Sequence, residues 1–170
     1  QPPVAATMAR LVWEMDKVAG HDRLPALYPK LVAWHRWWHQ VRCTHGPAAI
    51  IHPWESGRDN CPDWDIGMAG VDGSSVGDYT RRDTGHVDPS MRPRKEQYDK
   101  YIAMVQFGVR VGWDQAQSVA DGPFLMADPG ITFLLLRAHE DLIVLGAALG
   151  EDSSDIADWA ATLRAALPEI

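Results

Sequence analysis

At 170 residues, the chain suits one domain with a substantial hydrophobic core better than two domains. Its composition, 46% hydrophobic and 23% charged, is typical of a soluble globular protein, and its net charge of −7 disfavours a nucleic-acid partner. No run of basic residues indicates an anionic membrane surface, and charges within the most apolar stretch, residues 131–149, argue against a membrane span.

The cysteines and the first residues bear on where the protein resides. Cys43 and Cys61 allow one disulfide at most and belong to no CxxC pair, so no structural zinc site is expected. Sparse cysteine is typical of a reducing compartment, and we therefore expect a cytoplasmic protein. The chain begins without a signal-peptide profile or an initiator Met, as expected of a processed product or an excerpt of a longer chain.

Apolar residues recur at helical spacing in five stretches of the chain. They predict helices over residues 8–18, 24–38 (after a turn at Gly20), 98–112, 131–149 and 156–167. Asp128-Pro129-Gly130 is a typical start for the fourth helix and Gly150 a typical stop, and Ser153 or Ser154 is expected to cap the fifth. No run of alternating β-branched residues appears, so we expect an all-α protein whose consecutive helices pair as antiparallel hairpins.

Residues 44–94 interrupt this helical pattern. Gly, Pro, Asp and Ser are frequent there, and no helical stripe is sustained. An irregular segment of that length inside a domain is usually functional or disordered, and apolar residues such as Trp54 and Trp64 favour order. We therefore predict one domain over residues 1–170 with a long active-site loop at about 44–94.

The stretch "HPWESGRDNCPDWD", residues 52–65, concentrates carboxylates beside indole rings. Its acids are Glu55, Asp59, Asp63 and Asp65. Hydrolysis of a glycosidic bond needs two carboxyl groups in different protonation states. Trp54 would raise the pKa of a neighbouring acid, and Gly57 would allow a sharp turn or a close approach to a ligand. The alternative is a structural loop whose Asp and Asn side chains form turns and helix caps, and the residues alone leave both interpretations open.

Two further patterns also have structural alternatives. His35 and His39 in "HRWWH" have the spacing of metal-binding helices, but Arg36 stands where such a motif needs its glutamate. We therefore expect core or surface histidines and no metal. Arg92, just before the third helix, suits bidentate capture of a carboxylate, or else a salt bridge beside that helix.

Three stretches together resemble glycoside hydrolase family 63. They are "HPWESGRDNCPDWD", which is similar to the ESGxDNxPxW-type signature of that family, "DTGHVDPSMRP" followed by "YDKY", and "DPGITFLLLRAHEDL". The match covers most of residues 40–150 and resembles the bacterial branch that hydrolyses glucosylglycerate or mannosylglycerate. It implies an (α/α)6-barrel catalytic domain and inverting hydrolysis of a small α-glycoside without a cofactor.

The resemblance also implies roles for individual residues, carried over by position. Asp59 would be the general acid, and Arg92 and Tyr98 would hold the substrate, with Arg92 on the glycerate carboxylate. The residues expected to line or support the sugar subsite are Trp54, Glu55, Gly57 and Asn60.

An inverting hydrolase needs a second carboxylate as its base, about 6.5–9.5 Å from the acid. In the family this glutamate follows the helices found here, so we assign the base to no residue of the chain. The chain is therefore expected to be the central segment of a glycosidase catalytic domain. The alternatives are a trehalase or other α-glucosidase and, in another class, a non-catalytic helical carbohydrate-binding module or scaffold, and homo-oligomerisation is left open.

Overall fold

The computed structural model describes residues 2–167, and for residues 19–21 it describes the backbone alone. Contacts divide the chain into two compact units. The first, which we call the helical unit, consists of Gln1–Ala49 and Ala127–Ile170. The second, Ile50–Met126, carries the ESGRDN stretch, and we call it the loop unit.

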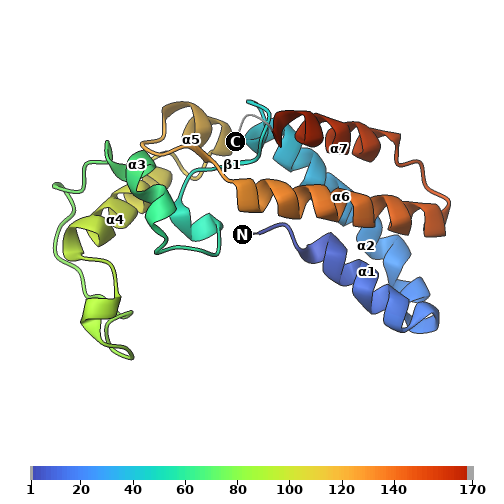
Figure 1. Cartoon of the computed structure of the whole chain (residues 1–170), viewed down its shortest axis with the longest axis horizontal. Coiled ribbons are helices and arrows are strands. Elements are labelled where there is room, and N and C mark those ends of the chain that lie inside the picture. Colours follow the sequence, from blue (N-terminus) through green and yellow to red (C-terminus); the bar gives the residue numbers. More distant parts are fainter. Residues whose placement is uncertain (1, 168–170) are drawn as a thin grey trace. The chain divides into compact units, whose positions relative to one another are not determined.

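The helical unit consists of two antiparallel hairpins (Figure 1). Helix α1 (Ala5–Met15) is followed by α2 (Lys17–Trp37), which continues as a π-helical turn (Trp38–Arg42). Helix α6 (Pro129–Leu149) is followed by α7 (Ser154–Ala166). Because α6 packs against α1, α2 and α7, it is buried on several sides, as its uniformly apolar sequence predicts.

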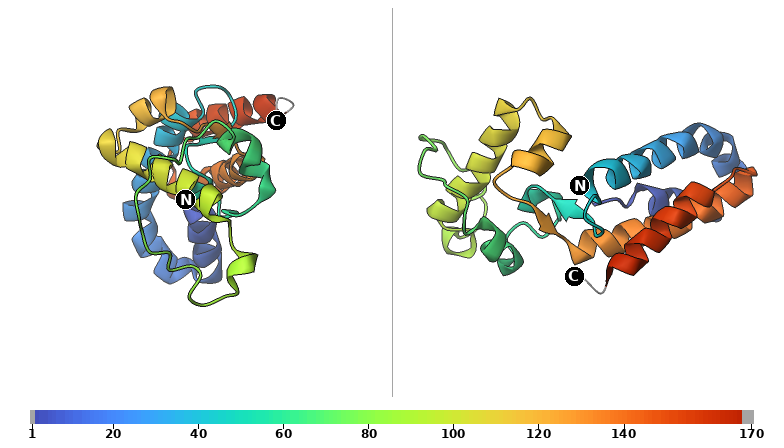
Figure 2. Two further views of the ribbon diagram at one scale, coloured as in Figure 1. Left: turned by 90° about the vertical axis from the view of Figure 1, so that its left-hand side faces the viewer. Right: turned by 90° about the horizontal axis from the view of Figure 1, so that it is seen from above.

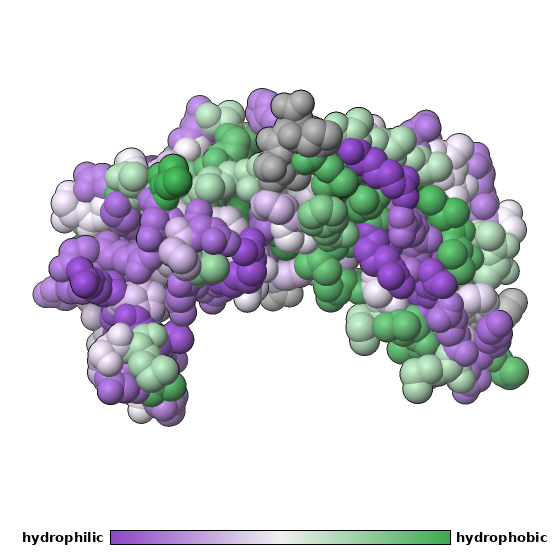
Figure 3. All heavy atoms as spheres, in the orientation of Figure 1, coloured by the Kyte–Doolittle hydropathy of each residue, from purple (hydrophilic) through white to green (hydrophobic). Residues whose placement is uncertain are grey.

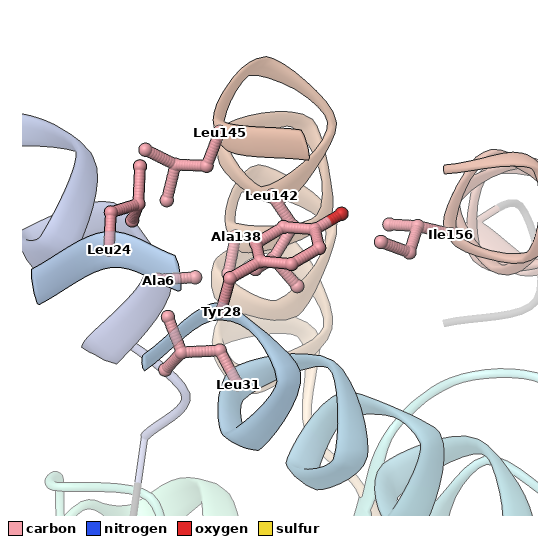
Figure 4. Close-up of a cluster of buried hydrophobic side chains, with 8 residues drawn as sticks. All are labelled: Ala6, Leu24, Tyr28, Leu31, Ala138, Leu142, Leu145 and Ile156. Carbon is pink, nitrogen blue, oxygen red and sulfur yellow. The ribbon is translucent and has the colours of Figure 1, made fainter. Parts of the chain in front are cut away.

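The core of the helical unit includes a cluster of buried side chains from all four helices (Figure 4). The members of this cluster are Ala6, Leu24, Tyr28, Leu31, Ala138, Leu142, Leu145 and Ile156. Tyr28 projects from α2 towards this cluster, and its hydroxyl lies 3.2 Å from the hydroxyl of Ser153 at the start of α7. The predicted hairpin packing is therefore confirmed at the level of individual contacts.

The predicted limits of α6 are confirmed. The Asp128 carboxylate accepts the N–H groups of Gly130 at 2.8 Å and Ile131 at 3.3 Å, which caps the helix. At the other end Gly150 has a φ of 72°, the left-handed conformation that closes many helices. Ser153 occupies the N-cap position of α7 as predicted, but it makes no capping hydrogen bond.

The turn predicted at Gly20 is wrong, because the chain turns at Asp16 and Gly20 lies within α2. The physical reason is that the Asp16 carboxylate accepts the N–H of Val18 at 3.1 Å and so satisfies a free donor at the start of the new helix. The helix boundary therefore lies at the short polar residue Asp16 and not at Gly20.

The loop unit combines helices with long irregular segments, as two further views show (Figure 2). Helix α4 (Lys95–Arg110) is the predicted third helix, whereas α5 (Gln115–Asp121) was not predicted. Between residues 44 and 94 the structured pieces are short: strand β1 (Ala49–Ile50), 3-10 turns at Pro53–Glu55, Pro62–Trp64 and Pro89–Met91, and α3 (Asp65–Met68). β1 pairs with β2 (Met126–Ala127), so little strand is present and the all-α prediction is confirmed.

The loop unit has buried hydrophobic residues of its own. Trp64, Tyr101 and Phe124 are among the largest fully buried side chains of the protein. Hydrophilic residues dominate the surface of the loop unit in Figure 3, whereas apolar residues reach the surface over parts of the helical unit. Among residues 2–167, no helix has both the length and the hydropathy needed to cross a membrane.

The histidines of "HRWWH" lie in the core of the helical unit. His35 and His139 are fully buried, and the ring of His139 lies 4.9 Å from that of His35 and 5.0 Å from that of His39. His39 also stacks on Trp159 at 5.2 Å. The core interpretation is therefore confirmed for His35. No group of three or more His, Cys, Asp or Glu residues in the described part of the chain could hold a metal ion.

Candidate active site

The ESGRDN stretch folds into two tight turns joined at Gly57. The imidazole of His52 accepts the N–H of Trp54 on Nδ1 at 3.0 Å, which starts the first turn. The Ser56 hydroxyl donates to the Pro53 carbonyl at 2.7 Å and accepts the N–H of Arg58 at 2.9 Å. Gly57 has a φ of 75°, a conformation that costs residues with a Cβ about 1–2 kcal/mol. The sharp turn predicted there is confirmed.

Glu55 closes the first turn. Its carboxylate accepts the N–H of Ile51 at 2.9 Å, so the acid binds the backbone just before its own turn. This bond gives Glu55 a structural role. The predicted role of Glu55 in lining the sugar subsite stays a prediction.

Asp59 follows the second turn with its carboxyl group available. The residue is partly buried, and neither carboxyl oxygen accepts a hydrogen bond from any of residues 2–167. Its backbone is fixed instead, since the Tyr101 hydroxyl donates to the Asp59 carbonyl at 2.9 Å. A carboxyl group with free oxygens on a fixed backbone is suited to proton transfer to a ligand.

The other acids of the stretch serve the loop. Asp63 forms an ion pair with Arg58, whose guanidinium also lies 5.0 Å from the ring of Trp64. Asp65 accepts a hydrogen bond from the side chain of Gln97 at 3.2 Å. Of the four acids, Asp59 therefore has the carboxyl group least committed to the protein's own hydrogen bonds.

Trp54 belongs to a group of aromatic rings in the loop unit. Its ring lies 4.5 Å from His52, 5.7 Å from Tyr101 and 6.1 Å from Tyr98. Trp54 is 38% exposed, so it is accessible from solvent although its ring packs on these neighbours. Trp54 and Tyr98, 44 residues apart in the sequence, are thus brought together, and their predicted binding of the substrate stays a prediction.

Arg92 is linked to this group through residues that the sequence did not single out. The Arg92 Nε donates to Asp83 at 3.1 Å, and Arg81 binds the same carboxylate through Nε at 3.1 Å and a terminal nitrogen at 2.6 Å. The Arg81 guanidinium lies 4.2 Å from the ring of Tyr98, on which Tyr79 stacks at 5.8 Å. No motif reveals this link, because "RRD" resembles ordinary loop charges.

Asn60 is exposed, and nothing among residues 2–167 contacts it through a hydrogen bond. Its predicted support of the loop is therefore not visible, and the hydrogen bonds described above take that role. The assignment of Asn60 to the site stays a prediction.

Two cavities lie away from these residues. One of about 500 Å³ in the helical unit is lined by α1 and α2, mostly with apolar side chains. One of about 490 Å³ in the loop unit is lined by the residues Asp65, Met68, Arg94, Glu96, Gln97 and Lys100. Neither contains any of the predicted site residues, so the candidate site is defined by the Asp59 turn and its aromatic neighbours.

Comparison with known proteins shows what this arrangement belongs to. Residues 1–170 match the model of the mannosylglycerate hydrolase MGH1-like glycoside hydrolase domain. The chain belongs to this glycoside hydrolase family. It is 40% identical over 163 residues to a mannosylglycerate hydrolase of Thermus thermophilus, covering 94% of this chain and 39% of that protein.

Two further relatives support the same family membership. The chain is 29% identical over 182 residues to the glucosylglycerate hydrolase of Mycolicibacterium hassiacum, covering 99% of this chain and 41% of that protein. The crystal structure of the family 63 mannosylglycerate hydrolase from another T. thermophilus strain, in complex with Tris and D-glycerate, superposes with a TM-score of 0.95 at 38% identity. That match covers 99% of this chain and 42% of the crystallised one.

The comparisons confirm the predicted family 63 membership, and with it the prediction that the helical hairpins form part of a helical barrel. The chain spans about two fifths of the length of the relatives described above. The whole relatives therefore contain residues with no counterpart in this chain.

Proposed function

We propose that the chain carries the acid half of the active site of an inverting α-glycoside hydrolase acting on glucosylglycerate or mannosylglycerate. The observation that carries this proposal is Asp59, a partly buried acid whose carboxyl oxygens accept no hydrogen bond from residues 2–167. Its backbone is held by hydrogen bonds at Arg58 and at Asp59 itself. The names of the relatives support the substrate class, since one is a mannosylglycerate hydrolase and another a glucosylglycerate hydrolase.

In this mechanism the Asp59 carboxyl group protonates the glycosidic oxygen as the bond to the anomeric carbon breaks. A water molecule attacks the opposite face of the sugar, activated by a second carboxylate at about 6.5–9.5 Å from the acid. Proton donation of this kind is typically worth about 10²–10⁴ in rate. The products are the free sugar with inverted configuration and glycerate.

We place the base outside this chain, and the contacts of the mid-helix acids support that proposal. Asp141 is fully buried and pairs with Arg10 at 2.8 Å. Glu140 pairs with Arg164 at 2.6 Å on the surface of the helical unit. Both carboxylates serve helix packing.

Arg92 favours a glycerate leaving group over the neutral one that a trehalase or another α-glucosidase would release. Only its Nε is bonded to Asp83, and within residues 2–167 its two terminal nitrogens have no hydrogen-bond partner. Two parallel N–H donors match the two oxygens of a carboxylate. The D-glycerate in the T. thermophilus crystal structure is consistent with this leaving group.

The test is Asp59→Asn in the complete enzyme that contains this chain. We expect the turnover of glucosylglycerate or mannosylglycerate to fall by about 10²–10⁴. Hydrolysis of the matching α-glycosyl fluoride should persist, because fluoride leaves without protonation. Asp63→Asn is the matched control, since Asp63 is in the same stretch but pairs with Arg58. Near-normal turnover of the natural substrate by the Asp59 variant would refute the assignment.

A further inference from the structure

We propose that Tyr101 and Trp64 are positioning residues that aim the carboxyl group of Asp59 by fixing the two peptide groups on either side of its Cα atom. This inference rests on the proposed role of Asp59 as the general acid. It assigns to two buried aromatic residues a function that their burial alone does not require.

The two hydrogen bonds lie on opposite sides of Asp59. The indole Nε1 of Trp64 donates to the carbonyl of Arg58 at 2.9 Å, and that carbonyl belongs to the peptide group preceding Asp59. The hydroxyl of Tyr101 donates to the carbonyl of Asp59 itself at 2.9 Å. Both peptide planes that meet at the Asp59 Cα are therefore held, and together they set the direction of its Cα–Cβ bond.

This control of direction matters because no hydrogen bond from the described residues holds the carboxyl group itself. No residue between 2 and 167 donates a hydrogen bond to the Asp59 carboxyl oxygens, so the carboxyl group is oriented from its backbone outwards. A displacement of about 1 Å at a reacting group can cost about 10²-fold in rate. The donors that fix the backbone are thus expected to affect proton transfer.

Both donors are themselves rigidly placed. Trp64 is 1% exposed and Tyr101 is 0% exposed. The carbonyl of Tyr101 lies 3.1 Å from His52 Nε2, while the other ring nitrogen of His52 accepts the N–H of Trp54. His52 Nε2 is therefore the donor to Tyr101. Tyr101 of helix α4 is thus bound to His52 through its carbonyl and to Asp59 through its hydroxyl.

The Tyr101 hydroxyl is suited to this task at all ordinary pH values. Burial, with the nearby Asp65 and Asp59 carboxylates, raises the pKa of Tyr101 to about 12, so the phenol keeps its proton and remains a donor. Tyr101→Phe retains the ring and removes only this donor. It is the smallest change that separates positioning from packing.

The experiment compares Tyr101→Phe with the unmodified complete enzyme on two substrates. We expect kcat for the glycerate glycoside to fall about 10- to 100-fold, with KM changed less than threefold. We expect kcat for the α-glycosyl fluoride to change less than threefold, because that substrate needs no proton. Trp64→Phe, which removes the other donor, should show the same selective loss.

Tyr28→Phe is the matched control. It removes a buried hydroxyl from the helical unit, where Tyr28 lies against Ser153, and should leave both turnover numbers unchanged. Thermal unfolding of all variants shows whether each is folded. An equal loss on both substrates, or no loss on either in folded Tyr101 and Trp64 variants, would overturn the positioning role.

The outcome for Asp59→Asn keeps the two proposals apart. If Asp59→Asn is inactive on the glycoside while Tyr101→Phe and Trp64→Phe are fully active, the acid stands and the positioning role fails. If Asp59→Asn retains turnover, the proposed function fails, and the positioning role fails with it.

Discussion

Arg92 binds the protein through Nε, and its two terminal nitrogens have no hydrogen-bond partner among residues 2–167. Its Nε is bound to Asp83, and Arg81 binds the same carboxylate. The hydrogen bond from Arg81, with a smaller contribution from Arg92, lowers the pKa of Asp83 to about 2, so this carboxylate stays charged although it is largely buried. Asp83 thereby orients Arg92 through Nε, and the proposed carboxylate clamp would use the two terminal nitrogens.

We expect Arg92→Gln in the complete enzyme to raise KM for glucosylglycerate or mannosylglycerate about 10- to 100-fold. A hydrogen bond to a charged group contributes about 1.5–3 kcal/mol, which corresponds to that range. Steady-state kinetics should show a much smaller effect on a neutral disaccharide. Arg82→Gln, an exposed neighbour in the same loop, is the control. Equal effects on charged and neutral substrates would exclude the carboxylate clamp.

Helix α6 shows how a charged group is accommodated inside an apolar helical unit. The fully buried Asp141 carboxylate accepts hydrogen bonds from Arg10 of α1 at 2.8 Å and from Arg137, one turn earlier in α6, at 3.1 Å. Two partners are needed because a buried carboxylate is costly unless it is paired and hydrogen-bonded. The ion pair between Arg10 and Asp141 therefore fixes how α1 lies on α6.

We predict that Asp141→Asn lowers the free energy of unfolding by about 2 kcal/mol, as expected for loss of hydrogen bonds to a charged group. Urea titration followed by circular dichroism measures this change. The adjacent Glu140→Gln is the matched control, because its ion pair with Arg164 is about half exposed and such surface pairs contribute about 0–1 kcal/mol. Comparable losses of unfolding free energy in the two variants would show that the burial of Asp141 does not make its ion pair more stabilising than a surface pair.

At the scale of the whole molecule, the three core histidines link stability to pH. Burial is the main cause that lowers the pKa of His35 and His39 to about 4 and that of His139 to about 2. The nitrogens of the His35 and His139 rings have no hydrogen-bond partner among residues 2–167. The folded protein therefore keeps these rings neutral at pH values where an unfolded chain would protonate them.

The free energy of unfolding should accordingly fall as the pH drops from about 6.5, the ordinary pKa of histidine, through about 4. In that interval the unfolded state binds more protons than the folded state, so each histidine lowers the stability by up to about 1.4 kcal/mol per pH unit. Urea unfolding at several pH values tests this. His35→Leu should make the free energy of unfolding depend less on pH, whereas the control His45→Gln, at an exposed residue, should leave this dependence unchanged. An unchanged pH dependence in His35→Leu would contradict this account.

The sequence predicted those elements whose signals are local. The hydrophobic period of α6, the cap at Asp128 and the stop at Gly150 lie within a few residues of the structure that they specify. Helix α5 was missed although Asp114 caps it, because seven residues give too short a period to recognise. The same local reasoning identified the Gly57 turn and selected the stretch that contains Asp59.

The sequence by itself thus determined the helical class, the main helices and, through the resemblance, the family. Only the tertiary structure decided which partners surround the candidate acid. Tyr101 and Asp59 are 42 residues apart, and Arg92 is linked to Tyr98 through Asp83 and Arg81. Such contacts depend on the path of irregular segments, which turns and side-chain hydrogen bonds set without any repeating pattern. Periodicity specifies a helix, but it does not specify where a loop brings its side chains.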